Sequence, residues 1–398
     1  MATSNRQASN ILFIHTSDLR ILRGSERWLI EVCNRLRDEN KDVIIDCFPS
    51  QLKKYVTNTV EVEARTKRVY SSFRGVPIKT RKWIALRLPF NGRIARVMNR
   101  NLQFVPLSFG FVRDLIKADT IYFVSTSDNP ARLLSILTIS LLTGKRRMFV
   151  GMHVSMIIPK QHLMLLRLFS RFGALTAIHA VNSKDALAYG NELKCRSVYI
   201  PNGVDCQKFR PGTKSETFTV LFVGALGFDK GADLLPEIYE ALTKHASTET
   251  IKFFIASPGG DFKESIQKWS RNREAVIMKG FVTEDELASL YREASVVLLP
   301  SRVEPFGLVA LEAQASGTPV IASSATGFRS TILNGETGYL VRSYDASHFA
   351  KQAYEIFQIW KSSRSIYSEM CAKARTHAES EFSWDPIIAS LQRLLEIA

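Results

Sequence analysis

The chain has 398 residues, 45% of them hydrophobic and 23% charged, which describes a soluble globular protein long enough for two domains. Its five cysteines have no short paired spacing, which argues against a zinc site or a disulfide framework and favours a reducing cytosol. The net charge of +15 is uneven: residues 1–200 carry 32 Lys and Arg against 14 Asp and Glu, whereas residues 201–398 carry 21 against 24. We therefore expect the first half to meet an anionic partner.

The chain's first apolar run, Ile11–Ile14, is too short for the core of a signal peptide, so we expect a cytoplasmic protein. The longest apolar stretch, Leu133–Leu142, has ten residues, whereas a transmembrane helix needs about 20. It predicts a buried helix instead.

Short apolar runs alternate with helical patterns along the first half, which predicts an α/β domain with a parallel sheet. Its strands are predicted at Ile11–Ile14, Val43–Phe48, Thr120–Val124, Arg147–Gly151, Ala177–Val181 and Val198–Ile200. The turn-rich residues Pro201–Asp205 predict a linker.

The second half restarts the same pattern, which predicts a second doubly wound domain. Its strands are predicted at Thr219–Val223, Lys252–Ala256, Val276–Met278, Val296–Leu299, Val320–Ala322 and Tyr339–Val341. We expect the domains to span residues 1–200 and 201–381, with a C-terminal helix, 382–398, packing back on the first domain.

The stretch from Arg65 to Arg100 contains eleven Lys and Arg and no acid, interleaved with aromatic residues. Such a segment suits an anionic membrane surface, with aromatic rings at headgroup level and cations against the lipid charge. The alternative is a solvated basic face that only keeps the protein soluble. No nucleic-acid-binding motif accompanies the charge, so we expect no nucleic-acid partner.

Two motifs follow predicted strands of the second half. Ser301–Gly307 follows the strand Val296–Leu299, and Gly224–Gly231 follows the strand Thr219–Val223. Ligands of open α/β sheets bind at the carboxyl ends of the strands, so both loops are placed for a ligand site.

The residues of these loops suit a nucleotide-sugar donor, whose diphosphate gains negative charge as the sugar bond breaks. The chain has no Asp-x-Asp motif to hold a metal ion, so no metal site is predicted. It offers Lys230 and the backbone N–H groups of a helix expected to begin near Leu308. Gly307 allows close approach of the backbone to a donor, and Pro305 stiffens the loop that presents Glu304.

Two glutamates, Glu304 and Glu312, lie eight positions apart. If the segment were helical throughout, they would be about 12 Å apart along the axis. A retaining glycosidase needs its two carboxyl groups about 5 Å apart. We therefore expect each glutamate to grip a different part of one elongated ligand.

Residues 301–341, with Gly224–Gly231 and Pro201–Asp205, closely resemble the retaining family 4 glycosyltransferases of GT-B fold. Weaker matches at Gly24–Glu26 and His153 extend the resemblance over most of the chain. It implies two Rossmann-like domains facing a central cleft, the first binding an acceptor and the second a nucleotide sugar. It further implies a metal-independent hexosyltransferase acting on a UDP- or GDP-sugar, with no cofactor besides this donor.

The resemblance also implies roles for single residues, with Glu304, His153 and Lys230 as the catalytic ones. Glu304 would bind the sugar hydroxyls, Glu312 the ribose and Lys230 the diphosphate, while His153 falls where the family has a histidine near the donor sugar. The remaining implied donor-binding residues are Gly24, Gly224, Pro305, Phe306, Gly307, Leu308 and Val309. Transfer would occur on the front face with retention, the leaving phosphate helping to deprotonate the acceptor hydroxyl.

The sequence departs from the family in three places. The arginine expected after Gly224 is Ala225, the Gly-Gly-x-x-Glu motif appears as Thr326–Ser330, and the N-terminal Gly-Gly as Arg23-Gly24. Arg23 or Arg329 could compensate for the missing charge. These departures keep open a catalytically weak scaffold subunit of a glycan-assembly complex, and a nucleotide-sugar epimerase is a further alternative. The acceptor, a glycan or a lipid-linked molecule, is expected on the basic first half.

Overall fold

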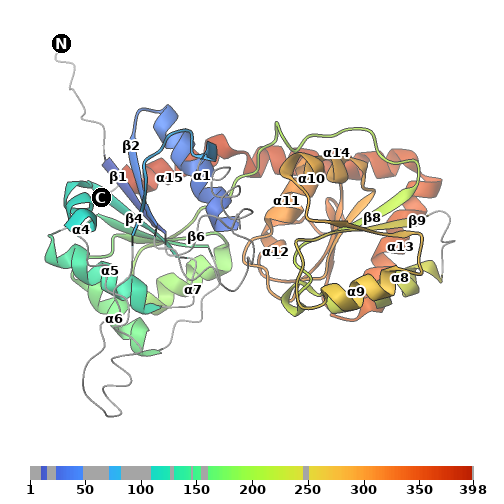
Figure 1. Cartoon of the computed structure of the whole chain (residues 1–398), viewed down its shortest axis with the longest axis horizontal. Coiled ribbons are helices and arrows are strands. Elements are labelled where there is room, and N and C mark those ends of the chain that lie inside the picture. The colour runs from blue at the N-terminus through green and yellow to red at the C-terminus, as the bar shows by residue number, and fades with distance from the viewer. Residues whose placement is uncertain are drawn as a thin grey trace. The chain divides into compact units, whose positions relative to one another are not determined.

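A computed structural model describes residues 10–15, 24–47, 71–81, 109–125, 130–144, 147–153, 160–244 and 251–396 (Figure 1). The chain forms two compact units, the first comprising residues 1–200 with 388–398 and the second residues 201–387. Each unit is built on its own parallel sheet, as expected for two doubly wound domains.

The sheet of the N-terminal unit has the strand order β3-β2-β1-β4-β5-β6-β7, and all its pairs are parallel. Strand β1 (Asn10–His15) pairs with β2 and β4, so that Phe13 lies opposite both Ile45 and Tyr122. The strands are β1 (Asn10–His15), β2 (Asp42–Cys47), β3 (Ile78–Thr80), β4 (Thr120–Ser125), β5 (Met148–Met152), β6 (Ala177–Ala180) and β7 (Ser197–Tyr199).

The helices of this unit bury apolar residues against the sheet. Side chains of four of them share one hydrophobic core with β1, β4, β5 and β6. These four are α4 (Phe109–Lys117), α5 (Pro130–Leu142), α6 (Lys160–Arg171) and α7 (Ser183–Leu193). Helix α1 (Gly24–Asp38) buries Trp28, Leu29 and Val32.

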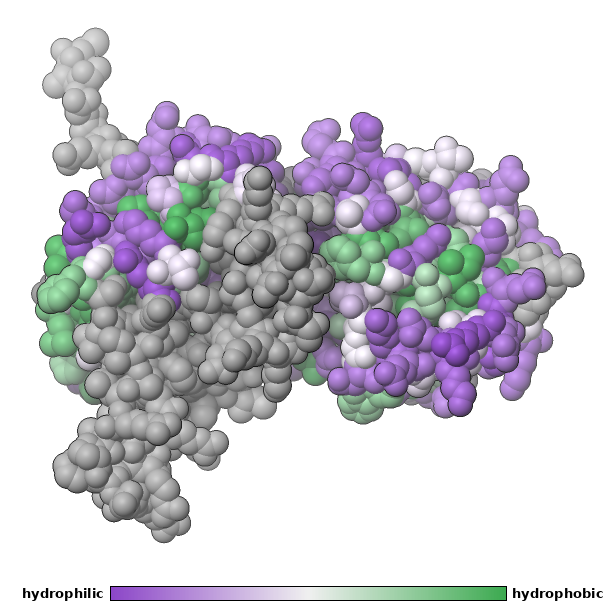
Figure 2. All heavy atoms as spheres, in the orientation of Figure 1, coloured by the Kyte–Doolittle hydropathy of each residue, from purple (hydrophilic) through white to green (hydrophobic). Residues whose placement is uncertain are grey.

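The prediction that Leu133–Leu142 is a buried helix was only partly right. The stretch forms most of α5, and Ile136 and Leu137 are fully buried, but Leu141 is 40% and Leu142 81% exposed. The helix covers the sheet with one face, so its last turn carries leucines into solvent. Figure 2 shows hydrophobic residues at the left edge of the unit, where Figure 1 labels α4 and α5.

The sheet of the C-terminal unit has the order β10-β9-β8-β11-β12-β13, again with parallel pairs. The strands are β8 (Phe218–Val223), β9 (Ile251–Ala256), β10 (Val276–Gly280), β11 (Val296–Leu299), β12 (Val320–Ser323) and β13 (Gly338–Val341). Its core is rich in aromatic side chains, among them Phe218, whose ring packs edge-on against Phe357 and Trp360.

Helices connect these strands and continue to the C-terminus. They are α8 (Leu235–Thr243), α9 (Lys263–Ser270), α10 (Glu284–Glu293), α11 (Leu308–Ala315), α12 (Phe328–Thr331), α13 (Ala346–Ser362), α14 (Arg364–Phe382) and α15 (Trp384–Glu396). Local sequence sets their starts: Thr283 and Glu286 form a reciprocal capping box at the start of α10. The end of α15 belongs to the N-terminal unit, where Glu396 lies 3.8 Å from the Lys41 ammonium.

All twelve predicted strands are present, and the predicted fold class is confirmed. Strand β3 was not predicted. Its Ile-Lys-Thr sequence has a single apolar residue, and as an edge strand it is only partly buried, so it lacks the apolar run that marked the others. Among the described residues, none of the helices combines the length and hydrophobicity needed to cross a bilayer.

Candidate functional site

The predicted donor loops meet at one edge of the C-terminal sheet. The segments 224–231, 257–262, 300–307 and 324–327 follow β8, β9, β11 and β12, which are neighbours in the sheet. Backbone hydrogen bonds join the first three loops: the Leu226 N–H donates to Gly259 O at 2.9 Å, and the Arg302 N–H to Asp229 O at 2.8 Å. Segments far apart in sequence thus form one layer of loops.

The loop before α11 is held in one conformation by its own glutamate. The Gly307 N–H donates to the Glu304 carboxylate (Oε1) at 3.1 Å, and the Gly327 N–H donates to the Glu304 carbonyl at 2.9 Å. Gly307 has φ +101°, and a Cβ there would lie 2.8 Å from the Phe328 ring. Only glycine fits this position without strain or a clash.

Lys230 and Glu304, two of the predicted catalytic residues, lie in direct contact. The lysine Nζ is 3.0 Å from Glu304 Oε2, and their side chains are 28% and 17% exposed. Lys230 belongs to the short 3-10 helix Phe228–Lys230 in the β8 loop, so the pair links two separate motifs. Partial exposure leaves both groups accessible to a charged ligand.

The first turn of α11 adds hydrogen-bond donors to this edge. The Ala310 N–H donates back to Gly307 O at 3.0 Å, whereas the N–H groups of Leu308 and Val309 donate to no group in the described part of the chain. Such donors at a helix N-terminus favour an anion. Gly224, Pro305 and Phe306, which were predicted to bind the donor, lie in the same two loops, with Phe306 buried.

Glu312 lies in a different environment from Glu304. It is 4% exposed on α11, and its Oε2 accepts a hydrogen bond of 2.9 Å from the Tyr291 hydroxyl of α10. Tyr291 is itself fully buried. The two glutamates therefore have separate partners, and only an edge of the Glu312 side chain is open to a ligand.

Arg302 is a supporting residue that the sequence did not single out. Its guanidinium makes a bidentate ion pair with Asp233 at 2.7 and 2.8 Å and lies 3.8 Å from the centroid of the Phe228 ring. This pair braces the β8 loop against the β11 loop. No sequence signal marked it, because its partners lie about 70 residues away in the chain.

The missing charge at the exposed Ala225 is not supplied by Arg302, whose guanidinium is neutralised by Asp233. Arg329 donates to the Ser324 carbonyl at 2.8 Å in the loop after β12, close in sequence to Gly327. Arg23 lies outside the described residues.

The backbone of Gly231, directly after Lys230, packs closely against the backbone at the end of β11. It has φ +69°, and a Cβ there would lie 2.2 Å from the Pro300 carbonyl oxygen. We expect Gly231→Ala to lower the free energy of unfolding by about 2 kcal/mol more than Gly280→Ala. Gly280 is a matched control, since its φ is +67° and nothing lies within 4 Å of its added Cβ. Urea unfolding measures both, and equal losses would contradict the predicted clash.

In the N-terminal unit, His153 follows β5 and joins a buried aromatic cluster. It is 7% exposed, with its ring centroid 4.3 Å from that of Trp28 and 5.5 Å from that of His179. Gly151 makes room for this cluster, because a Cβ there would lie 2.4 Å from the Tyr122 hydroxyl. His153 therefore packs with other rings, and its predicted contact with the donor sugar stays a prediction.

Gly24, the predicted N-terminal donor residue, begins α1. Two positions on, the buried Glu26 accepts a hydrogen bond of 2.9 Å from the Ser25 hydroxyl, and its other oxygen is 3.8 Å from His15 Nε2 at the end of β1. These contacts fix the first turn of α1 against the carboxyl end of β1.

The fully buried His179 predicts a pH dependence of stability. Its Nε2 donates to the Ile200 carbonyl at 2.6 Å, so Nδ1 accepts from the Tyr122 hydroxyl. Burial lowers the pKa of His179 from 6.5 to about 4. Between pH 6.5 and pH 4 the unfolded chain binds a proton at this histidine that the folded chain excludes. The contribution of neutral His179 to the free energy of unfolding, on the order of 3 kcal/mol, is therefore lost as pH falls from 6.5 to 4.

The measurement is a histidine-selective NMR titration, with the exposed His348 as an internal reference. We expect the His179 signals to stay those of the neutral ring at pH 5, and protonation near pH 6.5 would contradict the prediction. Asp46 acts in the opposite sense, because burial raises its pKa to about 6 and its contribution is lost as pH rises. The ring signals separate the two effects.

Most of the basic stretch Arg65–Arg100 lies outside the described residues, which include 71–81 of it. Within that part, Arg74 lies 3.6 Å from Asp38, Lys79 lies 2.7 Å from Asp114, and Arg81 lies 3.0 Å from Asp46. Acids from elsewhere in the chain thus neutralise cations that the sequence presented as unpaired.

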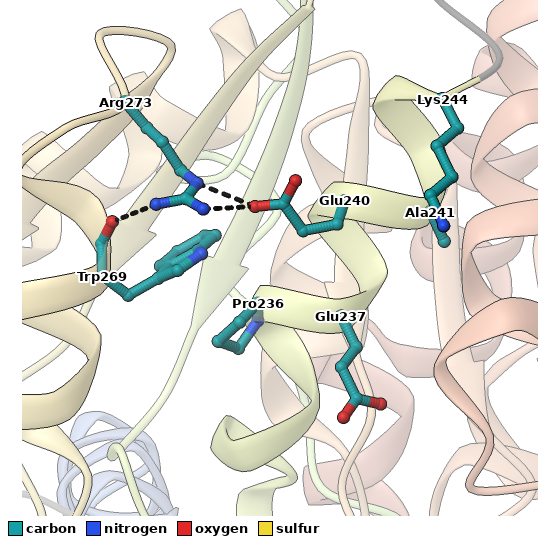
Figure 3. A pocket seen from close by; sticks show the side chains of 7 residues that line it. All are labelled: Pro236, Glu237, Glu240, Ala241, Lys244, Trp269 and Arg273. Carbon is teal, nitrogen blue, oxygen red and sulfur yellow. Dashed lines mark hydrogen bonds and ion pairs between the residues drawn. The ribbon is translucent and has the colours of Figure 1, made fainter.

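A surface pocket of about 390 Å³ lies between α8 and α9 (Figure 3). Arg273 crosses it, donating to Glu240 Oε1 at 2.8 Å and to the Trp269 carbonyl at 2.8 Å. Its lining residues are Pro236, Glu237, Glu240, Ala241, Lys244, Trp269 and Arg273. None of the predicted site residues lines this pocket.

The C-terminal unit matches a known family. Residues 205–372 match the family model described as glycosyl transferases group 1. An uncharacterized glycosyltransferase of Methanocaldococcus jannaschii is 32% identical over 189 residues, which are 47% of each chain. The D-inositol 3-phosphate glycosyltransferase 1 of Catenulispora acidiphila is 33% identical over 169 residues, 37% of this chain and 40% of that protein. The matched part thus spans about half the length of these relatives or less.

Solved structures match the fold over nearly the whole chain. The Anabaena protein Alr3699/HepE in complex with UDP aligns with a TM-score of 0.73 at 18% identity, covering 98% of this chain and 100% of that one. A glycosyltransferase from Rickettsia africae aligns with the same TM-score, identity and coverage. The chain therefore has the GT-B fold of two Rossmann-like domains.

Proposed function

We propose that the chain is a glycosyltransferase that moves a sugar from a nucleotide-diphosphate sugar, with UDP or GDP as the nucleotide, to a hydroxyl acceptor. The observation that carries this proposal is the Lys230–Glu304 pair, 3.0 Å apart, in the same layer of loops as the first turn of α11. The pair supplies a cation and a carboxylate, and the first turn of α11 adds backbone N–H donors that have no acceptor among the described residues; all lie in the region matched by the family model. The UDP bound in the Anabaena structure supports a donor of this class.

In this proposal each group handles a different part of the donor. The Lys230 ammonium and the N–H groups of Leu308 and Val309 bind the diphosphate and stabilise the charge that develops on it. Glu304 accepts hydrogen bonds from the sugar hydroxyls, and the edge of Glu312 binds the ribose. Gly224, Pro305, Phe306 and Gly307 shape the backbone around the donor.

The reaction proceeds on the front face with retention and without a metal ion. The bond from the anomeric carbon to the diphosphate oxygen breaks as the acceptor oxygen bonds the same face of that carbon. The acceptor proton passes to the leaving diphosphate, so no protein nucleophile is required. Lys230 and the backbone donors replace the charge that a metal ion would otherwise supply.

The acceptor binds to the basic N-terminal half and is a glycan or a lipid-linked molecule at the cytoplasmic face of a membrane. The net positive charge of residues 1–200 supports this assignment, since they contain 32 Lys and Arg but only 14 Asp and Glu. A second candidate, a catalytically weak scaffold, is favoured by the exposed Ala225 and by the neutralised Arg302.

The experiment is a screen of UDP- and GDP-sugars with the full chain, first without and then with acceptor alcohols, read by NMR. Slow release of free sugar and nucleoside diphosphate, and transfer with the donor's anomeric configuration, would support the proposal. An inverted product would refute retention. A changed sugar still attached to its nucleotide would identify an epimerase, and a folded chain that leaves every donor intact would favour the scaffold.

A further inference from the structure

Exposed apolar side chains of the N-terminal unit gather on one layer of helices. Nine large hydrophobic residues are exposed among the described residues of this unit, and eight of them lie on α4–α7 or the turn after α6. Five of these lie on α5, α6 and α7, which pack side by side, and a sixth lies in the turn after α6. We call these six the apolar face: Leu141, Leu142, Met164, Leu168, Phe172 and Leu187.

Helix α6 carries the centre of the apolar face. Met164, Leu168 and Phe172 follow at intervals of four residues and are 67%, 48% and 63% exposed, so they form one stripe. Leu166, on the opposite side of the helix, is 1% exposed in the core. A surface helix of a soluble domain usually turns a polar face to water, whereas this helix is apolar on both sides.

Cations flank the apolar face. Arg167 and Arg171 are exposed on α6 beside the stripe, and Lys184 is exposed on α7. Within the described residues, Arg167 donates to a backbone carbonyl, that of Glu192, so its charge is not neutralised by this bond. From residue 109 to residue 196 the sequence has 12 Lys and Arg against 5 Asp and Glu.

We propose that the apolar face and its flanking cations form a docking surface for an anionic lipid leaflet. A stripe of Met, Leu and Phe beside arginines suits the boundary between headgroups and acyl chains, where the apolar side chains leave water and the cations meet lipid phosphates. This inference rests on the proposed function, in which the acceptor lies at a membrane, and it names the surface that would contact that membrane.

The positive charge beside the apolar face favours a lipid leaflet over a second copy of the chain as its partner. A twofold contact would place the same patch on both subunits and bring Arg167 and Arg171 of each copy close to those of the other. A lipid leaflet instead offers negative charge to every one of them. The C-terminal unit, residues 201–387, carries 20 Lys and Arg against 23 Asp and Glu, so it lacks a positive charge that would attract an anionic leaflet.

The test is co-sedimentation of the full chain with vesicles of phosphatidylcholine alone or with about one third phosphatidylglycerol. We expect binding to the anionic vesicles that weakens as salt rises. The triple variant Met164→Ser, Leu168→Ser, Phe172→Ser should bind at least about tenfold more weakly, and so should Arg167→Glu with Arg171→Glu. The matched control replaces Phe281 and Ile366, exposed in the C-terminal unit at 64% and 52%, by serine and should bind as the wild type does.

Circular dichroism and UDP titration of the same variants separate this proposal from the donor site. Variants that keep their fold and their nucleotide affinity while losing vesicles would support the proposal. The proposal would be overturned if the triple variant bound anionic vesicles as strongly as the wild type does. It would also be overturned if the wild-type chain did not bind anionic vesicles. Light scattering that shows a dimer dissociated by the triple variant would assign the apolar face to a second copy instead. Loss of nucleotide binding with vesicle binding intact would refute only the proposed function.

Discussion

Glu304→Ala should lower kcat/KM for donor cleavage by about 10²–10³-fold while the fold is kept. The substitution removes the carboxylate that pairs with Lys230 at 3.0 Å and accepts the Gly307 N–H at 3.1 Å. It therefore disturbs both the proposed sugar contact and the loop before α11. Because Glu304 is partly exposed, a modest cost in stability is expected.

The measurement is steady-state nucleotide release with the donor found by the screen, beside circular dichroism. Glu304→Gln is the informative partner, since its amide oxygen can still accept the Gly307 N–H while the charge is lost. Glu336→Ala, at an exposed glutamate of the same unit, is the control and should have wild-type activity. Wild-type activity of Glu304→Ala would remove this residue from the mechanism.

Lys230→Ala should weaken binding of the nucleoside diphosphate by about 10- to 100-fold, because a charge-assisted contact to phosphate is lost. Lys230→Arg should recover part of the affinity, since the charge is kept but the shape differs. Calorimetric titration measures both. Lys351→Ala removes an exposed lysine of α13 and serves as the control for net charge.

An affinity unchanged in Lys230→Ala would place the phosphates elsewhere. The weakening should be smaller for the free nucleoside than for its diphosphate, because only the diphosphate presents charge to this side chain. Equal losses for both ligands would instead indicate a disturbed loop.

Much of the fold could be predicted from the sequence because each buried strand is a short apolar run between polar turns. The same rule missed β3, because Ile78–Thr80 has one apolar residue. It also predicted that all of α5 would be buried, whereas the terminal leucines of this helix face solvent. A local pattern marks apolar runs, but it does not reveal where the partner layer ends.

The donor loops could be located from their place after β8 and β11, whereas the contacts between them could not. The pairing of Lys230 with Glu304 joins positions 74 residues apart, and Arg302 with Asp233 joins positions 69 apart. Neither spacing has a local signature, so only the folded sheet edge reveals them. Likewise, Tyr291 gives no sign in the sequence that its hydroxyl will meet Glu312.

Calorimetric titration of the wild-type full chain with UDP and with GDP tests the proposed donor site most directly. We predict saturable binding of one of them at one site per chain, lost or strongly weakened in Lys230→Ala. A folded chain that binds neither nucleotide would contradict it.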